Sequence, residues 1–335
     1  MATSANFQLF SSSGDKPSLG LGFLESSEPP LPPPPPSIEV PSSEVSSSVK
    51  YTVEPVNLDG LTLLKGRVST KEVLGLPNSD LVPGIYEGGL KLWEGSIDLV
   101  KALRSEIQND RLSLTEKRVL ELGCGHGLPG IFACLEGAAE VHFQDFNAEV
   151  LRCLTIPNVN ANLLEKSQLD SASEARFFAG DWGEIHQLLP YAHESEISSE
   201  HGYDVILMAE TIYSISAQRD LYGLIKKCMI HPHGVVYMAG KKHYFGVGGG
   251  TRQFLSMLEK EGVMSATLVA EVADGSSNVR ELDQFQQELN SVLVIEGKLC
   301  LCYIDPSARV YQLNYQILRL EGSLSVSQPI SDYAF

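Results

Sequence analysis

Three glycines within five residues mark the segment of this chain that is best suited to bind a ligand. Gly123, Gly125 and Gly127 follow directly on a short apolar run, residues 119–122, and precede a run that is compatible with a helix. Glycine has no Cβ, so the backbone N–H groups of such a turn can approach a ligand closely. A strand, a glycine-rich turn and a helix in this order predict a site for a nucleotide-like ligand.

Two acidic residues indicate which ligand this is. Glu121 lies two residues before the first glycine, where it would repel a pyrophosphate and attract an ammonium group. Asp145 ends the next expected strand, a position from which an acid accepts hydrogen bonds from a ribose. S-adenosylmethionine carries an ammonium group, a sulfonium and a ribose, and it has no phosphate. The pattern therefore favours this cofactor over a dinucleotide, for which Gly125, Gly127 and Gly130 also have suitable spacing.

Four further residues complete the predicted cofactor site. Asp181 and Trp182 follow the third expected strand, where an acid can bind the adenine amine and an aromatic ring can cover the base. Trp93 lies in the glycine-rich segment 88–95, and a ring close to a sulfonium gains about 0.5–2 kcal/mol from a cation–π interaction. Asn147 ends the motif that begins with the second strand. For both tryptophans, a packing role is the alternative.

Residues after the fourth and fifth expected strands are candidates for the transfer reaction itself. Glu210 and Tyr213 follow the fourth strand, where the transferable methyl group should lie, and a carboxylate and a phenol there suit a nitrogen nucleophile. His243 lies in segment 240–252, which is rich in glycine and aromatic residues, and we expect this segment to form a mobile lip that binds the substrate. It is no P-loop, because it lacks Gly-Lys followed by Ser or Thr.

Beyond residue 85 the expected elements alternate between helices and strands. Such alternation predicts an α/β fold with a doubly wound, mostly parallel sheet of seven strands. Ligands of these sheets bind at the carboxyl ends of the strands, which is where the glycine turn and the candidate acids fall. The expected helices cover residues 93–107, 127–136, 147–154, 217–229 and 251–262. The expected strands cover residues 118–122, 140–145, 176–181, 203–209, 234–240, 264–272, 291–304 and 310–320.

The first part of the 335-residue chain has the composition of a disordered segment. Residues 1–50 contain 13 serines and 9 prolines, and they cannot bury enough apolar surface to offset their ordering entropy. We therefore predict a disordered and transitional tail over residues 1–75 and one folded domain over residues 76–325. No stretch approaches the ~20 apolar residues that span a bilayer, and the first residues lack the pattern of a signal peptide.

The net charge and the spacing of the cysteines indicate which binding partners and which cellular compartment to expect for this chain. The formal net charge is −17, and the six cysteines are scattered without the spacing of disulfides or metal ligands. An acidic chain disfavours direct binding of a nucleic-acid backbone and suits a basic protein substrate, although acidity can also serve solubility alone. Scattered cysteines indicate a reducing compartment, which we take to be the cytoplasm and the nucleus. We expect a monomer that contacts no membrane and holds no metal.

Seven motifs together resemble those of the eukaryotic histidine protein methyltransferases. They begin at Gly88, Glu121, Val141, Pro157, Arg176, Glu210 and His243. The last of them, His-Tyr-Phe-Gly-Val-Gly-Gly-Gly, is the most discriminating. The resemblance implies a Rossmann-like methyltransferase that uses S-adenosylmethionine and releases S-adenosylhomocysteine. It also implies methylation of one histidine, at the tele nitrogen, in a large-subunit ribosomal protein.

On this interpretation Glu210, or a backbone carbonyl nearby, accepts a hydrogen bond from the target ring and fixes its tautomer, while Tyr213 and His243 frame the ring. The pKa of an imidazole is near 6.5, so the ring is mostly neutral at pH 7, and one nitrogen of a neutral ring has a free lone pair. The enzyme must therefore align the ring rather than deprotonate it. Two alternatives stay open. One is a protein-lysine methyltransferase of the same superfamily, and the other is a catalytically silent module that binds a ribosomal protein as a chaperone.

Overall fold

The computed structural model describes most of the chain. The described residues are 31–77, 79–163, 173–192, 201–273, 279–287, 291–295, 298–303 and 314–318. The chain divides into a first part, residues 1–32, and a second part that begins at Pro33. Residues 1–30 of the predicted tail lie outside the described residues, so every element below belongs to the second part.

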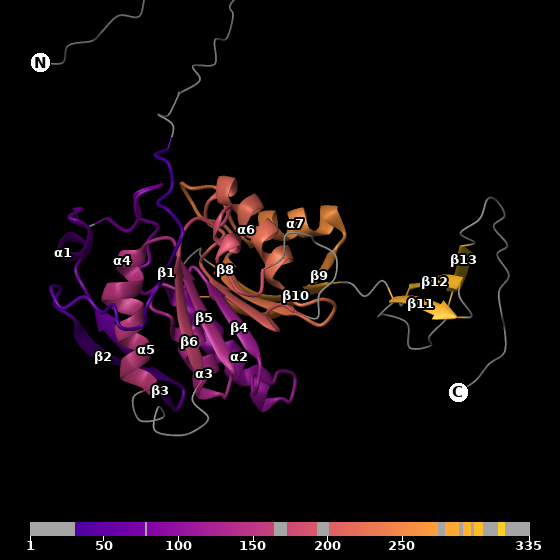
Figure 1. The fold of residues 1–335 in the computed structure, drawn as a ribbon, viewed down its shortest axis with the longest axis horizontal. Coiled ribbons are helices and arrows are strands. Elements are labelled where there is room, and N and C mark those ends of the chain that lie inside the picture. Colours follow the sequence, from indigo (N-terminus) through magenta and orange to yellow (C-terminus); the bar gives the residue numbers. More distant parts are fainter. Residues whose placement is uncertain are drawn as a thin grey trace, which may run out of the picture. The chain divides into compact units, whose positions relative to one another are not determined.

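An eight-stranded sheet forms the centre of the second part (Figure 1). Its strand order is β1-β6-β5-β4-β7-β8-β10-β9. Neighbours from β6 to β8 run parallel, whereas β1, β10 and β9 pair antiparallel with their neighbours. The predicted doubly wound, mostly parallel sheet is therefore confirmed, but it has eight strands where seven were predicted, because β1 of the predicted tail adds to its edge. The strands are β1 (Ile38–Val40), β4 (Arg118–Leu122), β5 (Glu140–Asp145), β6 (Glu174–Ala179), β7 (Val205–Ala209), β8 (Val235–Lys241), β9 (Met264–Ala273) and β10 (Val279–Gln287).

Helices cover both faces of this sheet, because its central strands are apolar on both sides. In β7, Val205 and Leu207 pack in one core cluster with residues of α2, α3 and α5, whereas Ile206 and Met208 pack in another with residues of α6 and α7. The helices are α1 (Thr70–Leu74), α2 (Glu94–Gln108), α3 (Leu128–Leu135), α4 (Ala148–Val150), a π-helical turn (Leu151–Thr155), α5 (Ile156–Leu163), a 3-10 turn (Ile185–Gln187), α6 (Ile215–Cys228) and α7 (Thr251–Glu261). Within the described ranges, none of these helices combines the length and the apolar character that a membrane span requires.

Two segments of the predicted tail form strands. β1 pairs with the edge strand β6, and Glu39 binds Arg176 across this pair with N–O distances of 2.8 and 2.9 Å. β2 (Thr52–Leu58) and β3 (Leu61–Arg67) form a hairpin, and Asn162 of α5 exchanges two hydrogen bonds with the backbone of Leu64 in it. The prediction of disorder up to residue 50 is thus wrong for β1, because pairing with an existing sheet edge satisfies a backbone that its composition could not order alone.

The last strand of the main sheet also differs from the expectation. β10, which the sequence did not reveal, takes the place beside β8. Strands that we expected later in the chain form a separate three-stranded sheet of β11 (Ser291–Ile295), β12 (Lys298–Tyr303) and β13 (Asn314–Leu318). Charged residues obscure the apolar pattern of β10, and one of them, Arg280, is buried against Asp98 at 2.6 Å and Glu94 at 3.0 Å. These two carboxylates offset the cost of burying the guanidinium.

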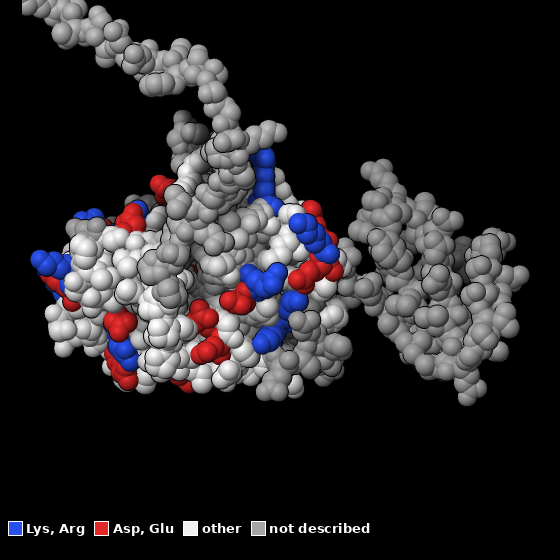
Figure 2. All heavy atoms as spheres, turned by 90° about the horizontal axis from the view of Figure 1, so that it is seen from above, with Lys and Arg blue, Asp and Glu red and all other residues white. Residues whose placement is uncertain are grey.

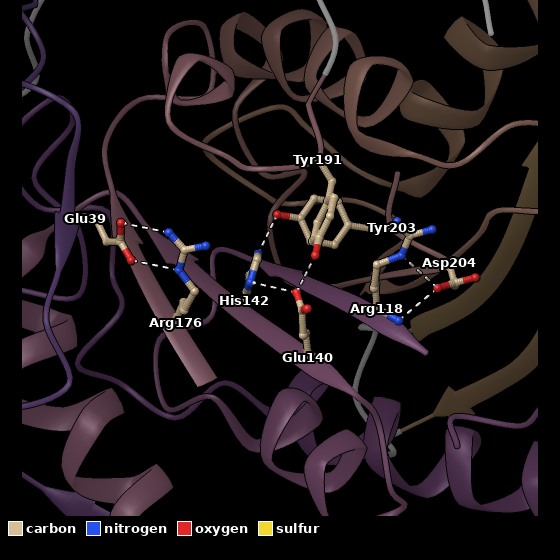
Figure 3. A network of polar contacts seen from close by, with 8 residues as sticks. All are labelled: Glu39, Arg118, Glu140, His142, Arg176, Tyr191, Tyr203 and Asp204. Carbon is tan, nitrogen blue, oxygen red and sulfur yellow. Dashed lines mark hydrogen bonds and ion pairs between the residues drawn. The ribbon is translucent and has the colours of Figure 1, made fainter. Parts of the chain in front are cut away.

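A network of charged and aromatic side chains lies at the amino edge of the sheet, where the parallel strands begin (Figure 3). Glu140, the first residue of β5, accepts a hydrogen bond from Tyr191 at 2.7 Å. His142, fully buried in the same strand, shares a hydrogen bond of 2.7 Å with Tyr203. Two ion pairs, Arg118–Asp204 and Arg176–Glu39, flank these residues.

Candidate functional site

A hollow of about 470 Å³ opens at the carboxyl ends of the parallel strands, and we call it the first hollow. The ends of β4, β5 and β7 meet there, because the carboxyl ends of parallel strands share one edge of a sheet. The predicted site residues that line it are Trp93, Gly123, Gly125, Asp145, Trp182, Glu210 and Tyr213. The predicted site residues outside its lining are Glu121, Gly127, Asn147, Asp181 and His243.

The glycine turn leaves one wall of the first hollow bare. Gly123 and Gly125 have φ values of 61° and 49°, in the left-handed region that side chains with a Cβ rarely adopt. A Cβ on Gly125 would lie 2.9 Å from the carbonyl oxygen of Gly89, and one on Gly123 would lie 2.7 Å from Thr211 Cγ2. A wall that any side chain would obstruct fits the amino-acid part of S-adenosylmethionine, which the sequence predicts at this turn.

Asp145 is held with its carboxylate at the first hollow. Its Oδ2 accepts a hydrogen bond from the Gly125 N–H at 2.9 Å, and its Oδ1 accepts one from the Asn147 N–H at 3.2 Å. Burial raises the pKa of Asp145 to about 6, and these backbone donors limit the rise. Above that pH the carboxylate is charged and can accept hydrogen bonds from ribose hydroxyls, which is the role predicted from the sequence.

Asn147 positions the segment before α2 instead of lining the first hollow. Its Nδ2 donates to the Ile85 carbonyl at 2.8 Å, and its Oδ1 accepts from the Glu87 N–H at 3.3 Å. Asn147 thereby fixes Glu87, a lining residue that the sequence analysis missed. Glu87 stands directly before the glycine pair and belongs to no helix or strand, so no periodic pattern could single it out.

Trp182 forms part of the wall, whereas Asp181 points elsewhere. The Trp182 Nε1 donates to Gln144 Oε1 at 2.9 Å, and Gln144 Nε2 donates in turn to the Gly180 carbonyl at 2.9 Å. This chain of hydrogen bonds fixes the indole beside the hollow. Asp181 accepts from the Gly183 N–H at 2.9 Å, so its carboxylate caps a local turn. Asp181 lies outside the lining of the first hollow, and its predicted contact with an adenine amine stays a prediction.

Glu121 and Gly127 serve the packing of the turn. Glu121 Oε2 accepts from the Gly130 N–H, in the first turn of α3, at 2.8 Å. Burial raises the pKa of Glu121 well above its usual range. A Cβ on Gly127 would lie 3.1 Å from Thr155 Cγ2 and 3.2 Å from Phe143 Cε1, so this glycine lets two elements approach. Glu121 thus binds the start of α3, and its predicted contact with an ammonium group stays a prediction.

A second hollow of about 440 Å³ adjoins the first. Four residues line both hollows: Glu87, Trp93, Glu210 and Tyr213. The other lining residues of the second hollow are Leu81, Gly88, Tyr244 and Val247. Two connected hollows, one walled by glycines and one by aromatic and apolar side chains, can hold a cofactor and a ring of the substrate side by side.

Glu210 stands at the junction of the two hollows with an unusual backbone. Its φ is 58°, a left-handed value that costs a residue with a side chain about 1 kcal/mol or more. Its Oε2 accepts a hydrogen bond from the Tyr244 hydroxyl at 2.5 Å, whereas its Oε1 is buried without a partner. Burial raises the pKa of Glu210, and the bond from Tyr244 opposes this rise. An unpaired buried oxygen is costly, so we interpret it as a place for a ligand donor.

The lip after β8 contributes Tyr244 rather than His243. Tyr244 lines the second hollow, and its backbone N–H donates to the Gly249 carbonyl at 2.9 Å. Gly249 in turn donates to the Tyr213 carbonyl at 3.0 Å, which ties the lip to the segment after β7. His243 is exposed and lines neither hollow, so its predicted role of framing the target ring stays a prediction that this geometry does not support. Tyr213 is placed as predicted, and its hydroxyl donates to Glu87.

The sequence of this chain is similar to those of known protein methyltransferases. Residues 84–261, more than half of the chain, match the model of a family described as lysine methyltransferase. "Histidine protein methyltransferase 1 homolog" of Dictyostelium discoideum is 40% identical over 215 residues, which cover 64% of this chain and 63% of that protein. The protein of the same name from Bos taurus is 34% identical over 249 residues, which cover 68% of this chain and 62% of that protein.

A protein named for a different target is less similar. "EEF1A lysine methyltransferase 3" of Mus musculus is 26% identical over 151 residues, which cover 45% of this chain and 55% of that protein. The chain spans about three fifths of the length of the two relatives named for histidine.

Proposed function

This chain belongs to the family described as lysine methyltransferase, and within that family we propose that it is an S-adenosylmethionine-dependent protein-histidine N-methyltransferase. The observation that carries the proposal is that Glu210 lines both hollows and has one buried carboxylate oxygen, Oε1, without a partner. The names of the relatives from Dictyostelium discoideum and Bos taurus support histidine as the target.

The first hollow is the proposed place of the cofactor. When bound, S-adenosylmethionine supplies a methyl group on a positively charged sulfur. Gly123 and Gly125 leave room for its amino-acid part, and Asp145 accepts from its ribose hydroxyls. Trp182 lies beside the hollow with its ring fixed by Gln144. These residues bind and orient, and they exclude water from the junction where transfer takes place.

The second hollow is the proposed place of the target imidazole. Glu210 Oε1 accepts from the N–H of one ring nitrogen, which leaves the lone pair of the other nitrogen free to face the first hollow. Tyr213 and Tyr244, whose ring centroids lie 6.4 Å apart, bound the ring on two sides. Glu210 also offsets the positive charge that the ring acquires with the methyl group, until the N–H proton leaves to solvent.

A protein substrate suits the surroundings of the second hollow. Phe245, in the lip, is 75% exposed, and Ile215, which approaches Gly248 of the lip, is 52% exposed. Apolar side chains at the mouth of a hollow favour contact with another protein. Acidic and basic side chains intermingle on the face drawn in Figure 2, and the chain carries a net charge of −17. This charge supports a basic protein rather than a nucleic-acid backbone as the partner.

The full proposal names one histidine of a large-subunit ribosomal protein, methylated at the tele nitrogen by a monomer in the cytoplasm or the nucleus. The acidic chain and the motif resemblance support this substrate. It is tested with labelled S-adenosylmethionine and ribosomal proteins from cells that lack the enzyme. Mass spectrometry should place the label on a single histidine, and the methylhistidine isomer should be the tele form.

Glu210→Gln tests the role of the unpaired oxygen. We expect kcat to fall about 10- to 100-fold, as for the loss of a hydrogen bond to a charged group, with unchanged cofactor affinity. Asp283→Asn is the matched control, because Asp283 is also a buried acid with an unpaired oxygen and lines neither hollow. Full turnover by Glu210→Gln would falsify the assigned role.

The description of the matched family favours a lysine target as the second candidate. Replacement of the target histidine by lysine in a substrate peptide separates the two activities. Label on the lysine peptide alone would move the chain to the lysine enzymes. A third candidate, a silent chaperone, would bind the ribosomal protein and transfer no methyl group, and it would keep this binding after the glycine turn is disrupted.

A further inference from the structure

We infer that Glu87 is a positioning residue that directs the Tyr213 hydroxyl and so restricts the second hollow to side chains that donate hydrogen bonds. This inference rests on the proposed function, since the donor it concerns is the N–H of the target imidazole. Glu87 lines both hollows, although no motif or periodic pattern pointed to it.

Three hydrogen bonds fix Glu87. Its backbone N–H donates to Asn147 Oδ1 at 3.3 Å. One carboxylate oxygen, Oε1, accepts from the Gly84 N–H at 2.7 Å, and the other, Oε2, accepts from the Tyr213 hydroxyl. A carboxylate only accepts hydrogen bonds, so the Tyr213 proton must point toward Glu87.

The direction of that proton decides what Tyr213 offers to the second hollow. A phenol has one proton, and Tyr213 uses it on Glu87, so only lone pairs of its oxygen are left for a ligand. Burial raises the pKa of Tyr213 above its usual range, with the nearby Glu87 adding to the rise, so the phenol keeps its proton at neutral pH. Glu87 thereby makes Tyr213 an acceptor.

The other polar side chains of the second hollow are oriented in the same sense. The Tyr244 hydroxyl donates to Glu210, and the Trp93 Nε1 donates to the Gly88 carbonyl at 3.0 Å. Every side-chain donor in the described lining of this hollow is therefore engaged within the protein. The polar side chains that remain able to bind a ligand are acceptors: the Tyr213 oxygen, whose proton is used on Glu87, and the carboxylates of Glu87 and Glu210.

An acceptor-only wall selects one tautomer and one orientation of a neutral imidazole. The nitrogen that carries the proton turns toward the wall, and the nitrogen with the lone pair turns away from it, toward the first hollow. In the opposite orientation two lone pairs would face each other, which costs the ring nitrogen its hydrogen bond. Glu87 contributes to this selection without touching the substrate, through Tyr213.

Glu87→Gln should reverse the direction of the hydrogen bond between residue 87 and Tyr213. The Gln Oε1 must still accept from the Gly84 N–H, because the flipped amide would place two donors face to face. Its Nε2 then donates to the Tyr213 oxygen, and the phenol proton turns into the second hollow. We expect kcat for histidine methylation to fall about 10- to 100-fold, with cofactor affinity unchanged.

A second substitution distinguishes this reversal from damage to the fold. Tyr213→Phe removes the misdirected proton, so the double variant Glu87→Gln/Tyr213→Phe should turn over faster than Glu87→Gln alone and about as fast as Tyr213→Phe. Glu140→Gln is the matched control, since Glu140 also accepts from a tyrosine, Tyr191, but at the amino edge of the sheet. It should leave kcat unchanged.

The outcomes separate the inference from the proposed function. A wild-type chain that methylates no histidine would overturn both. If the wild type is active and the double variant is no faster than Glu87→Gln, or if Glu87→Gln keeps the wild-type kcat, the positioning role is wrong while the proposed function stands. Recovery of the rate in the double variant, with an inert Glu140→Gln, supports the inference.

Discussion

The amino and carboxyl edges of the central sheet differ in whether their charged side chains have partners within the protein. At the amino edge, Glu140 accepts from Tyr191, and the arginines of the network pair with acids (Figure 3). At the carboxyl edge, Glu210 is buried with one oxygen unpaired and a left-handed backbone. Satisfied groups stabilise a fold, whereas an unsatisfied group gains its partner only from a ligand. Buried atoms without a hydrogen-bond partner also occur elsewhere, at His142 Nε2 of the amino edge and at Asp283 Oδ2. What distinguishes the carboxyl edge is that its unpaired acid, Glu210, lines two hollows.

Two histidines illustrate the same contrast. His142, at the amino edge, is fully buried, bonds to Tyr203, and stacks on Tyr191 with ring centroids 5.8 Å apart. Burial lowers the pKa of His142 to about 4, and the charge of Arg176 contributes, so the ring is neutral at pH 7. Its role is structural. His243, which the lip motif indicated as a site residue, is exposed and lines neither hollow, whereas carboxylates and phenols line both.

The two edges should differ most in how a substitution of a left-handed glycine changes cofactor affinity. Gly125→Ala places a Cβ 2.9 Å from the Gly89 carbonyl, in the wall of the first hollow. We expect cofactor affinity to fall on the order of 100-fold, or about 2.7 kcal/mol, measured by calorimetry. Gly137→Ala is the control before β5: its φ is 86°, but its Cβ would meet nothing closer than Thr115 at 3.8 Å.

Gly137→Ala should reduce stability by about 1 kcal/mol, the cost of a side chain in left-handed backbone, and leave cofactor affinity unchanged. Equal losses of affinity in both glycine variants would contradict the assignment of the carboxyl edge as the binding edge.

Substitution of His142 should have an intermediate effect, which is a change in how the free energy of unfolding depends on pH. Because the folded-state pKa of His142 lies near 4, below the usual 6.5, the unfolded chain binds a proton between these values and the folded chain does not. The free energy of unfolding should therefore fall as the pH decreases from 6.5, by about 2 kcal/mol at pH 4.5 from this histidine. His142→Gln should flatten that part of the profile, measured by urea unfolding.

His126 is also buried, and burial lowers its pKa to about 4 as well. Its contribution to the pH dependence of stability should therefore remain in the His142→Gln variant. Cofactor affinity at pH 7 should be the same as in the wild type, because His142 lies at the amino edge. An unchanged pH profile in His142→Gln would show that His142 has the same pKa in the folded and the unfolded chain, which contradicts the lowered value.

The smallest effect is expected at the ion pair between Arg176 and Glu39. The two side chains are 32% and 46% exposed, so water and salt screen the pair. Arg176→Ala should cost about 0.2–1 kcal/mol of stability, less at high salt, and should leave kcat unchanged. Urea unfolding at two salt concentrations measures the first effect. A large loss of activity would mean that the docking of β1 reaches the site.

Features that depend on the local backbone, such as strands and tight turns, could be predicted from the sequence. The strand bounds 118–122 and 140–145 match β4 and β5, and the glycine turn lies between β4 and α3 as predicted. These features depend on a few consecutive residues: apolar residues that make a buried strand, glycines that adopt positive φ, and an acid at a strand end. For that reason the predicted cofactor wall needed no knowledge of the remaining fold.

Side-chain direction and long-range pairing were decided only by the tertiary structure. Tyr244 rather than its neighbour His243 enters the second hollow, because Gly249 holds the Tyr244 backbone and is itself held by Tyr213. Glu87 becomes a site residue through Asn147, sixty positions later in the chain. Which of two adjacent side chains faces a hollow depends on contacts between distant segments, and no pattern of consecutive residues encodes such contacts.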